Sequence, residues 1–498
     1  MKSIMVVGTT SHAGKSLITT AICRIMSRRG WRVTPFKGQN MALNAYVTAS
    51  GGEIGYAQAV QAWAAGVAPL VEMNPILLKP QGDMTSQVIL KGKAVGKVSA
   101  TDYYRDYFEI GWQTIQECLQ SLSTEFDAIV CEGAGSPAEI NLKHRDLTNM
   151  RVAKHLNAPT LLVVDIDRGG AFAHVVGTLE LLDPDERALI KGVLINKFRG
   201  QRSILEPGIK WLEERTGIPV VGVVPYIEQL FPAEDSLDLL ERKTTKTAAE
   251  LNIAVIRLPR IANFTDFDPL ESEPSVRVKY LLPKQDLGHP DAVIIPGTKT
   301  TIADLIVLQK SGMAEAIQNY AASGGTVLGI CGGFQMLGQT IADPEGVEGQ
   351  AGKYPGLNLL PIKTVITGQK IARQRQVTSN YPQIGLPVAG FEIHQGRTTY
   401  TSPSLSRSEH SADQKSCQAL FDDNNLGLVD NSQSVWGTYL HGIFDNGPWR
   451  RAWVNRLRQQ RGLKSLPTGV SNYREEREQI LDSLATQIEE HLDLTPFL

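Results

Sequence analysis

The sequence of 498 residues has few cysteines, almost no net charge and no long hydrophobic run. Its 5 cysteines are scattered without a CxxC pair, which argues against a disulfide framework and against a zinc site. The formal net charge of -2 leaves no electrostatic footprint for nucleic acid or for an anionic membrane. Since no apolar run approaches the ~20 residues that span a bilayer, we expect no membrane segment.

The first residues, KSIMVVG, run directly into a glycine-rich loop and predict a β-strand rather than a signal peptide. Cytoplasm is therefore the expected compartment. The chain has also no internal repeat of short period. A hydrophobic content of 42% and a charged content of 20% are ordinary for a globular protein. The length exceeds what one hydrophobic core supports, so we expect two or three domains.

Short apolar runs alternate with helical patterns over the first half of the chain. Most runs are continuously apolar, as expected for strands buried on both faces of a parallel sheet. The predicted strands are Ile4–Val7, Val33–Phe36, Ala128–Val130, Thr160–Val164, Gly192–Ile195 and Val220–Val224. A strand, a glycine loop, an amphipathic helix and a second strand open a doubly wound α/β fold.

A second α/β series follows a polar, charged stretch. Its predicted strands are Asn252–Arg257, Asp291–Pro296 and Thr326–Ile330. Two segments, Gln369–Pro382 and Ser402–Asn425, predict loop-like insertions. The last residues are rich in Arg, Glu, Gln and Leu and predict helix. The expected fold class is therefore α/β, with two doubly wound domains, of which the first has a parallel sheet.

A phosphate-binding loop lies between the first predicted strand and the first helix. Small residues let backbone N–H groups approach phosphate oxygens, the lysine reaches the terminal phosphates, and the last hydroxyl can bind Mg²⁺. The leading glycine stands one residue earlier than in GxxxxGK[ST], where this chain has threonine. The predicted nucleotide-binding residues are Gly8, Thr9, Thr10, Ser11, His12, Ala13, Gly14, Lys15 and Ser16.

Acidic residues follow other strands of the same predicted sheet. Glu132 comes at the end of one strand, and Asp165 and Asp167 come at the end of another. The carboxyl ends of parallel strands meet at the ligand crevice, where carboxylates can hold Mg²⁺ against phosphates. Each alone could equally be a helix cap, but together with the loop they favour a metal site. Lys37, directly after a strand, is a further candidate phosphate contact.

A thiol stands at a sharp turn from strand to helix in GICGGFQMLG. The strand Thr326–Ile330 runs straight into Cys331, and a helical pattern follows. The helix N-terminus favours the thiolate form of such a cysteine. Gly332 and Gly333 leave backbone N–H groups free for an oxyanion hole. The pattern therefore predicts a nucleophilic cysteine, although a lone cysteine is more often a buried structural thiol.

A general base for this thiol is predicted at His441, in YLHGIF, at the end of a short apolar run. The alternative is a histidine that caps a helix. These two motifs resemble the class I glutamine amidotransferase domain of the cobBQ type. Other class I members carry a glutamate two residues after the histidine, where this chain has Ile443. The resemblance thus implies a Cys–His dyad, with a less firmly oriented imidazole and slow glutamine hydrolysis until the other substrates bind.

The phosphate loop resembles that of dethiobiotin synthetase and its relatives. By this resemblance, Lys37 contacts transferred phosphate, and Ser16, Glu53 and Glu132 are the candidate Mg²⁺ ligands. The expected domains are a nucleotide-binding synthetase domain at 1–235, a linker at 236–250, a glutamine amidotransferase domain at 251–455, and a helical tail at 456–498.

The order of the two domains resembles the cobyric acid synthase family. Family-like segments include FKGQNMALNAYVT, NFTDFDPL, PGTKTT and FEIHQGRT. The resemblance implies amidation of the b, d, e and g carboxylates of adenosylcobyrinic acid a,c-diamide, with ATP and Mg²⁺ as cofactors. Its implied partners are glutamine, ATP and a corrinoid, with no nucleic acid or membrane, and the oligomeric state stays open. No role follows from the sequence for His394.

Two other functions remain possible at this point. Cobyrinic acid a,c-diamide synthase shares both domain types and differs in the carboxylates it amidates. A regulatory P-loop ATPase with a non-catalytic glutaminase-like domain is the alternative outside the amide ligases. The intact pair of Cys331 and His441 argues against the second.

Overall fold

The computed structural model describes the whole chain except residues 83–84, 228–245, 247–248 and 402–416. It divides the chain into two compact units. Unit 1 consists of Met1–Ala42, Gly52–Glu234 and Arg477–Leu498, and unit 2 of Leu43–Gly51 and Asp235–Glu476. The predicted linker, 236–250, lies for the most part outside the described residues.

Unit 1 is built on a six-stranded sheet in the order β12-β11-β10-β1-β9-β2, and every described pairing in it is parallel. The strands are β1 (Lys2–Gly8), β2 (Val33–Phe36), β9 (Ala128–Glu132), β10 (Thr160–Asp165), β11 (Ile190–Phe198) and β12 (Val220–Pro225). All six predicted strands are confirmed, with ends that differ by a few residues. The predicted α/β class with a parallel first sheet is therefore confirmed.

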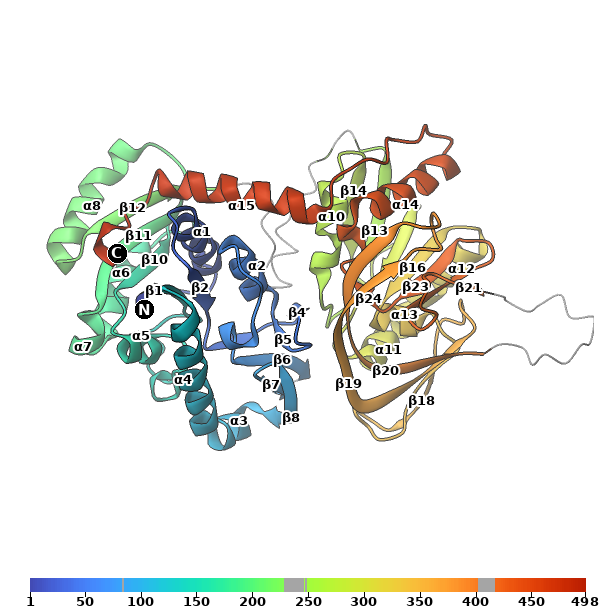
Figure 1. The fold of residues 1–498 in the computed structure, drawn as a ribbon, viewed down its shortest axis with the longest axis horizontal. Helices are drawn as coiled ribbons and strands as arrows, with labels where there is room; N and C mark the ends of the chain where they lie inside the picture. The colour runs from blue at the N-terminus through green and yellow to red at the C-terminus, as the bar shows by residue number, and fades with distance from the viewer. Residues whose placement is uncertain (83–84, 228–245, 247–248, 402–416) are drawn as a thin grey trace, which may run out of the picture. The chain divides into compact units, whose positions relative to one another are not determined.

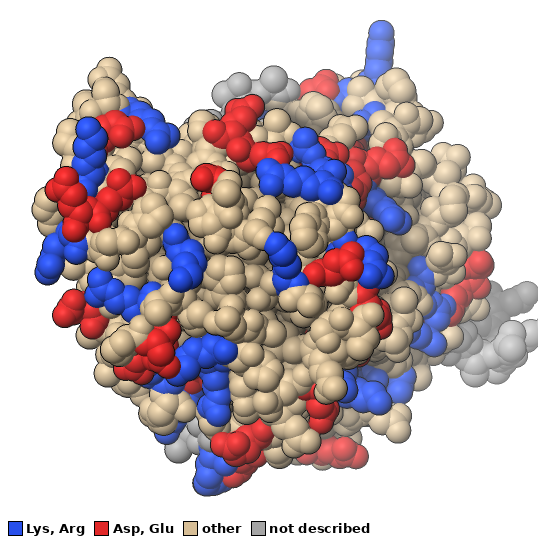
Figure 2. Space-filling model, turned by 60° about the vertical axis from the view of Figure 1, so that its left-hand side comes forward, with Lys and Arg blue, Asp and Glu red and all other residues tan. Residues whose placement is uncertain are grey.

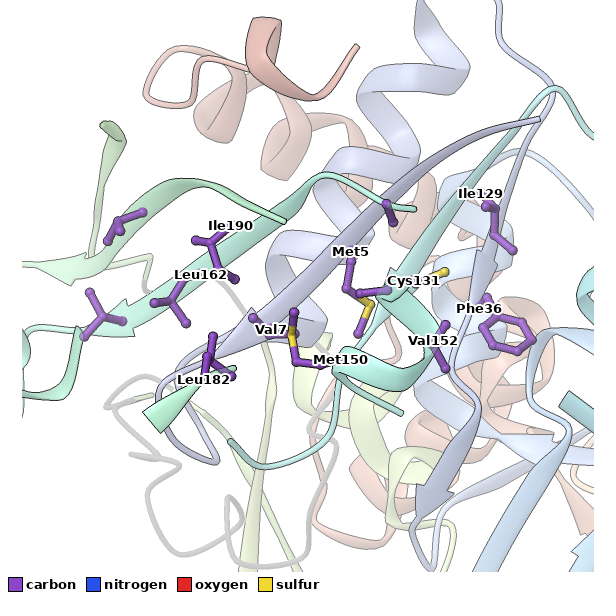
Figure 3. Packing of buried hydrophobic residues seen from close by; sticks show 14 of the residues in the cluster. Met5, Val7, Phe36, Ile129, Cys131, Met150, Val152, Leu162, Leu182 and Ile190 are labelled. Carbon is purple, nitrogen blue, oxygen red and sulfur yellow. The ribbon is translucent and has the colours of Figure 1, made fainter. Parts of the chain in front are cut away.

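Helices cover both faces of this sheet, which explains why its strands are continuously apolar. On β1, Met5 and Val7 belong to one buried cluster, and Ile4 and Val6 belong to the other. Figure 3 shows the first cluster, where Met5 and Val7 lie among Met150, Leu162 and Leu182. The main helices are α1 (Lys15–Arg28), α2 (Tyr56–Ala64), α4 (Phe108–Glu125), α5 (Met150–Leu156), α6 (Ala171–Leu181) and α8 (Arg202–Thr216).

A smaller sheet, β3-β6-β7-β8, also belongs to unit 1. Its strands are β3 (Gln39–Met41), β6 (Ile76–Gly82), β7 (Thr85–Leu90) and β8 (Lys93–Ser99), and the short strand β5 (Glu53–Gly55) precedes α2. The helices α3 (Ala100–Asp106) and α7 (Pro184–Arg187) are short.

Unit 2 contains a seven-stranded sheet in the order β14-β13-β15-β16-β23-β22-β21. Its first five strands pair in parallel, and β22 and β21 add to the edge in antiparallel fashion. The strands are β13 (Leu251–Ile256), β14 (Val276–Leu281), β15 (Ala292–Ile295), β16 (Thr326–Ile330), β21 (Cys417–Ala419), β22 (Gly427–Asp430) and β23 (Val435–Thr438). The three strands predicted for this domain are confirmed as β13, β15 and β16.

A second sheet of unit 2 corrects one expectation. It has the order β18-β17-β19-β20-β24, with β17 (Thr340–Asp343), β18 (Gly352–Pro355), β19 (Ile362–Thr378), β20 (Pro387–Tyr400) and β24 (Leu440–His441). The predicted loop Gln369–Pro382 is wrong over its first part, because β19 continues to Thr378 and pairs with β20. Of the second predicted loop, Ser402–Asn425, residues 402–416 lie outside the described residues, and the prediction is wrong for Cys417–Ala419, which form the strand β21.

The α-helices that lie wholly within the described part of unit 2 are α10 (Asp268–Ser272), α11 (Thr301–Ser311), α12 (Met313–Ala322), α13 (Gly332–Met336) and α14 (Gly447–Gln460). The last helix, α15 (Tyr473–Glu489), begins in unit 2 and continues into unit 1. Its residues Leu481, Leu484 and Ile488 lie in the same buried cluster as α1. The chain end is thus part of a core rather than a separate tail, which differs from the boundaries that the sequence predicts.

Charged residues of both signs are interspersed on the face that Figure 2 shows, in line with the formal net charge of -2. Within the described part of the chain, no helix is both long and apolar enough to cross a bilayer.

Candidate active sites

The predicted phosphate loop joins β1 to α1 in unit 1. Gly14 has a φ of 99°, and a Cβ there would stand 2.2 Å from Asn196 Nδ2, so glycine is required on both counts. Asn196 donates to the carbonyl of Ala13 at 2.9 Å, and Lys197 Nζ donates to that of His12 at 2.8 Å. The end of β11 therefore holds the loop backbone in place before any ligand binds.

Glu132 is the common hydrogen-bond acceptor for polar side chains around this loop. Its Oε1 accepts hydrogen bonds from Ser16 Oγ and from Lys37 Nζ, both at 2.8 Å, and its Oε2 accepts one from Gln61. Glu132 and Lys37 are buried. Lys15 Nζ lies over the loop and donates to the carbonyls of Thr10 and Gly135, both at 3.0 Å. The structure thus brings the predicted lysines, serine and carboxylate together.

The other predicted metal ligand has a different partner. Glu53 forms a buried ion pair with Lys79. Asp165 pairs with Lys197 at 2.9 Å, and Asp167 pairs with Arg199 at 3.1 Å. No group of three or more His, Cys, Asp or Glu residues within the described ranges has the arrangement of a metal site. Ser16 and Glu132 are therefore the predicted metal ligands that lie side by side.

Cys331 occupies the turn between β16 and α13 in unit 2. Its φ of 53° and ψ of −108° are a rare conformation for a residue with a side chain, and such strain is found at functional sites. The Cys331 N–H donates to the carbonyl of Thr438 at 2.8 Å, and its Sγ lies 3.4 Å from the carbonyl of Ile393. Gly332 and Gly333, the predicted oxyanion-hole residues, form the N-terminus of α13.

His441 lies beside Cys331, as the sequence predicts. A Cβ built on Gly297 would stand 3.2 Å from His441 Cε1 and 3.7 Å from Cys331 Cβ, so both side chains border the same point. His441 is buried, and its Nε2 has no hydrogen-bond partner among the residues that the structure describes. A buried ring nitrogen with no partner is available to exchange a proton with the thiol.

Asp266 orients this histidine. Its Oδ2 lies 2.7 Å from His441 Nδ1, and its Oδ1 accepts the N–H of Gly442 at 2.8 Å. Burial favours the neutral imidazole, but Asp266 and the thiol of Cys331 outweigh it and raise the pKa of His441 from 6.5 to about 10. The expectation of a weakly oriented imidazole is therefore wrong, because a carboxylate from another part of the chain holds the ring.

Sequence reasoning missed Asp266 as a functional residue. It lies in the short 3-10 helix Phe264–Phe267, far from His441 in the chain. The family-like segment NFTDFDPL was the available signal, and it contains both Asp266 and Asp268. Spacing alone does not distinguish these two acids.

His394, which had no predicted role, lies in the same site. Its ring stacks on Tyr439 with centroids 3.7 Å apart, and its Nδ1 lies 2.9 Å from the carbonyl of Gly396. Tyr439 accepts a hydrogen bond from Gln335 of α13 at 3.1 Å. The FEIHQGRT segment on β20 therefore supports the helix that follows the nucleophile.

The remaining cysteines differ from Cys331 in their surroundings. Cys23, Cys118 and Cys131 are buried in the cores of unit 1. Burial raises the pKa of Cys118 to about 12, and it raises the pKa of Cys23 and of Cys131 further. These three thiols are therefore poor nucleophiles.

Two family models match the chain, one for each unit's main segment. Residues 4–239 match a CobQ/CobB/MinD/ParA nucleotide binding domain. Residues 252–449 match a CobB/CobQ-like glutamine amidotransferase domain. The two ranges contain the phosphate loop and the Cys331–His441 pair, respectively.

Full-length relatives are also similar. A cobyric acid synthase from Nostoc punctiforme is 82% identical over 100% of this chain and 100% of its own length. The cobyric acid synthase of Trichodesmium erythraeum is 69% identical over 100% of both chains. Among solved structures, PurLQS from Thermotoga maritima has 17% identity and a TM-score of 0.30 over 47% of this chain and 99% of that chain.

Proposed function

The chain belongs to the cobyric acid synthase family, and on that basis we propose that it is an ATP-dependent, glutamine-hydrolysing amide ligase acting on a corrinoid. Its substrate would be adenosylcobyrinic acid a,c-diamide, with amidation of the b, d, e and g carboxylates to give adenosylcobyric acid. The reaction would consume one ATP and one glutamine for each amide. The cytoplasm is the proposed compartment.

Unit 1 would activate the carboxylate. A carboxylate is a poor electrophile, so transfer of a phosphoryl group from ATP must first convert it to an acyl phosphate. Lys15, at the loop that holds the phosphates, would neutralise charge that develops on the transferred group. Lys37 would contact the same group, because its ammonium lies next to the loop through Glu132.

Mg²⁺ fits the oxygen donors at this loop. Ser16 Oγ and Glu132 Oε1 lie 2.8 Å apart, and Mg²⁺ in nucleotide sites takes one or two protein oxygens together with phosphates and water. Bound Mg²⁺ would supply charge neutralisation on the phosphates. We propose Ser16 and Glu132 as its ligands. Both carboxylates pair with a lysine, but Glu132 also accepts the hydroxyl of Ser16 in the phosphate loop, which makes Glu53 the weaker candidate.

Unit 2 would release ammonia from glutamine. The Cys331 sulfur would attack the side-chain amide, with the backbone N–H groups of Gly332 and Gly333 near the developing oxyanion. His441 would return its Nε2 proton to the leaving nitrogen, so that ammonia departs and a thioester stays on the sulfur. Water activated by the same ring would then release glutamate and restore the thiol.

The observation that carries this proposal is the arrangement of Cys331, His441 and Asp266 at one site in unit 2. The same chain carries a phosphate loop in unit 1, where Ser16 donates to Glu132. A carboxylate 2.7 Å from one imidazole nitrogen and an unpartnered second nitrogen beside a strained cysteine fit nucleophilic catalysis. A non-catalytic domain has no need of this arrangement.

Release of glutamate from glutamine tests the glutaminase half. Wild type should produce glutamate, and Cys331→Ala should not. The matched control is Cys417→Ala, a cysteine of the same unit without a part in the site. Equal rates for wild type and Cys331→Ala would contradict the proposal and favour a regulatory ATPase.

Mass spectrometry of the corrinoid product tests the substrate. With ATP and glutamine, the a,c-diamide should gain four amide groups, each of which changes the mass by the exchange of OH for NH₂. Addition of two amides to cobyrinic acid, with no reaction of the a,c-diamide, would instead identify an a,c-diamide synthase.

A further inference from the structure

One short segment of the first half of the chain belongs to the glutaminase unit. Residues Leu43–Gly51 are part of unit 2, although Ala42 before them and Gly52 after them are part of unit 1. The segment contains the strand β4 (Ala45–Val47), which packs against β19 and β20. Ala45 and Val47 are fully buried there. The segment is therefore an integral part of the core around the glutaminase site.

Two asparagines join this segment to the loop that carries Asp266. The N–H of Ala45 donates to Asn263 Oδ1 at 2.9 Å, and the N–H of Phe264 donates to Asn44 Oδ1 at 3.2 Å. Both asparagines are buried. Each side chain thus satisfies a buried backbone donor of the other segment, and the loss of either would leave that donor without this partner.

Tyr46 of this segment is connected to the imidazole of His441 through the ring of Phe391. Tyr46 meets Phe391 edge to face, with centroids 5.3 Å apart. Phe391 in turn stacks on His441, with centroids 5.4 Å apart and planes 20° apart. Gln374 also donates a hydrogen bond to the carbonyl of Val47. The segment therefore supports both neighbours of His441, which are the Asp266 loop and the Phe391 ring.

We propose that residues 43–51 position the Asp266–His441 pair for glutamine hydrolysis, with Asn44, Tyr46 and Asn263 as the positioning residues. This inference rests on the proposed glutaminase function of Cys331. These contacts act through the loop that carries Asp266 and through the ring of Phe391, both of which contact the imidazole of His441. Their effect should therefore fall on the rate of the chemical step and leave glutamine affinity nearly unchanged.

The segment 43–51 lies in the sequence between two stretches that belong to unit 1. It follows directly on β3 and precedes β5, and Lys37 and Glu53 lie at these two flanks in unit 1. The support for the glutaminase histidine is thus encoded within the synthetase half of the chain. Residues 252–449, the range of the amidotransferase model, do not include it.

Replacement of Asn263 tests the proposal in the full-length enzyme. Asn263 has a φ of 53°, so Asn263→Gly keeps the backbone conformation and removes the whole buried carboxamide, including the oxygen that accepts the N–H of Ala45. We expect kcat for glutamine hydrolysis to fall about 10-fold to 100-fold, the range that a misplacement of up to ~1 Å costs. The KM for glutamine should change less than about threefold. Asn263→Asp restores an acceptor and should recover most of the rate.

Two controls separate positioning from a loss of folding. Asn157, an exposed asparagine of unit 1, also has a left-handed backbone, with a φ of 48°, and Asn157→Gly should leave the rate unchanged. Ammonium chloride replaces glutamine as the nitrogen source, and Asn263→Gly should amidate the corrinoid with it at the wild-type rate. This second assay does not use the glutaminase site.

Three results would overturn the proposal. They are a glutaminase kcat of Asn263→Gly within twofold of wild type, an equal loss of the ammonia-driven activity, and a failure of Asn263→Asp to recover the rate. Loss of the underlying function would look different, because wild type itself would then release no more glutamate than Cys331→Ala.

Discussion

Replacement of Asp266 by asparagine should inactivate the glutaminase through the tautomer of His441. In the wild-type site, Asp266 Oδ1 accepts the N–H of Gly442 at 2.8 Å, and Oδ2 lies 2.7 Å from His441 Nδ1. The Gly442 N–H will keep the carboxamide oxygen of the variant on its own side. The amide NH₂ must then face Nδ1 and donate to it, which leaves the imidazole proton on Nε2. A protonated Nε2 cannot take the proton of the Cys331 thiol.

The size of the effect can be taken from the equivalent exchange in serine enzymes. There the wrong tautomer lowers kcat by about 10⁴. A cysteine depends less on its base, because part of it is already thiolate at neutral pH. We therefore expect a loss of about 10² to 10³ in kcat for Asp266→Asn, which corresponds to about 3 to 4 kcal/mol in the activation free energy.

The assay is the initial rate of glutamate release, with kcat and KM determined separately. KM for glutamine should stay near the wild-type value, and amidation with ammonium chloride should be preserved. Asp266→Ala is the informative comparison, because it offers no donor to Nδ1 and leaves the ring free to adopt either tautomer. It should retain more activity than Asp266→Asn. The reverse order, or an asparagine variant within threefold of wild type, would refute the tautomer argument.

Three further predictions concern other parts of the chain. Glu132→Gln should abolish ADP release coupled to amidation and spare glutamine hydrolysis, because Ser16 and Lys37 both donate to this carboxylate. Gly333→Ala would place its Cβ 1.9 Å from the Ile295 carbonyl oxygen, so urea denaturation should show that the free energy of unfolding falls by about 3 kcal/mol or more. Gly368→Ala is the control, because a Cβ there would meet no described atom within 4 Å apart from its chain neighbours, and it should show no loss. Because the folded state raises the pKa of His441 from 6.5 to about 10, its ionisation stabilises the fold fully below pH 6.5, and this contribution is lost as the pH rises toward 10. The urea midpoint of wild type should thus exceed that of His441→Gln by more at pH 6 than at pH 10, and a constant difference would contradict the assignment.

The sequence predicts those parts of the fold that are encoded over a few neighbouring residues. Strands such as β1 and β10 are buried on both faces, so their apolar runs mark them directly. The phosphate loop and the Cys331 turn are likewise continuous in sequence, and both depend on glycines at fixed places. The residues that lie together at Glu132 could be expected because parallel strands end at one edge.

Features that depend on distant segments or on exposed strands were not predictable in this way. The part of β19 from Gln369 to Thr378 is largely polar and exposed or half-buried, with Val377 as its one buried residue, so it lacks the apolar alternation that marks a strand with one buried face. Nothing in the local sequence indicates that Leu43–Gly51 belongs to unit 2, because a short β-strand has the same sequence pattern in either unit. Its place becomes evident only from its partners, Asn263 and Phe391.

The orientation of His441 shows what the absence of a motif does and does not imply. The chain lacks a glutamate two residues after the histidine, and this absence correctly predicts that no carboxylate comes from that position. The imidazole still needs an acceptor at Nδ1, because a buried ring nitrogen without one would lose its orientation and its preference for the reactive tautomer. Asp266 meets this need from the segment that Asn44 and Asn263 hold together. When the acid next to the histidine is missing, an orienting group can therefore come from elsewhere in the fold. The missing acid does not by itself show that the site consists of a cysteine and a histidine alone.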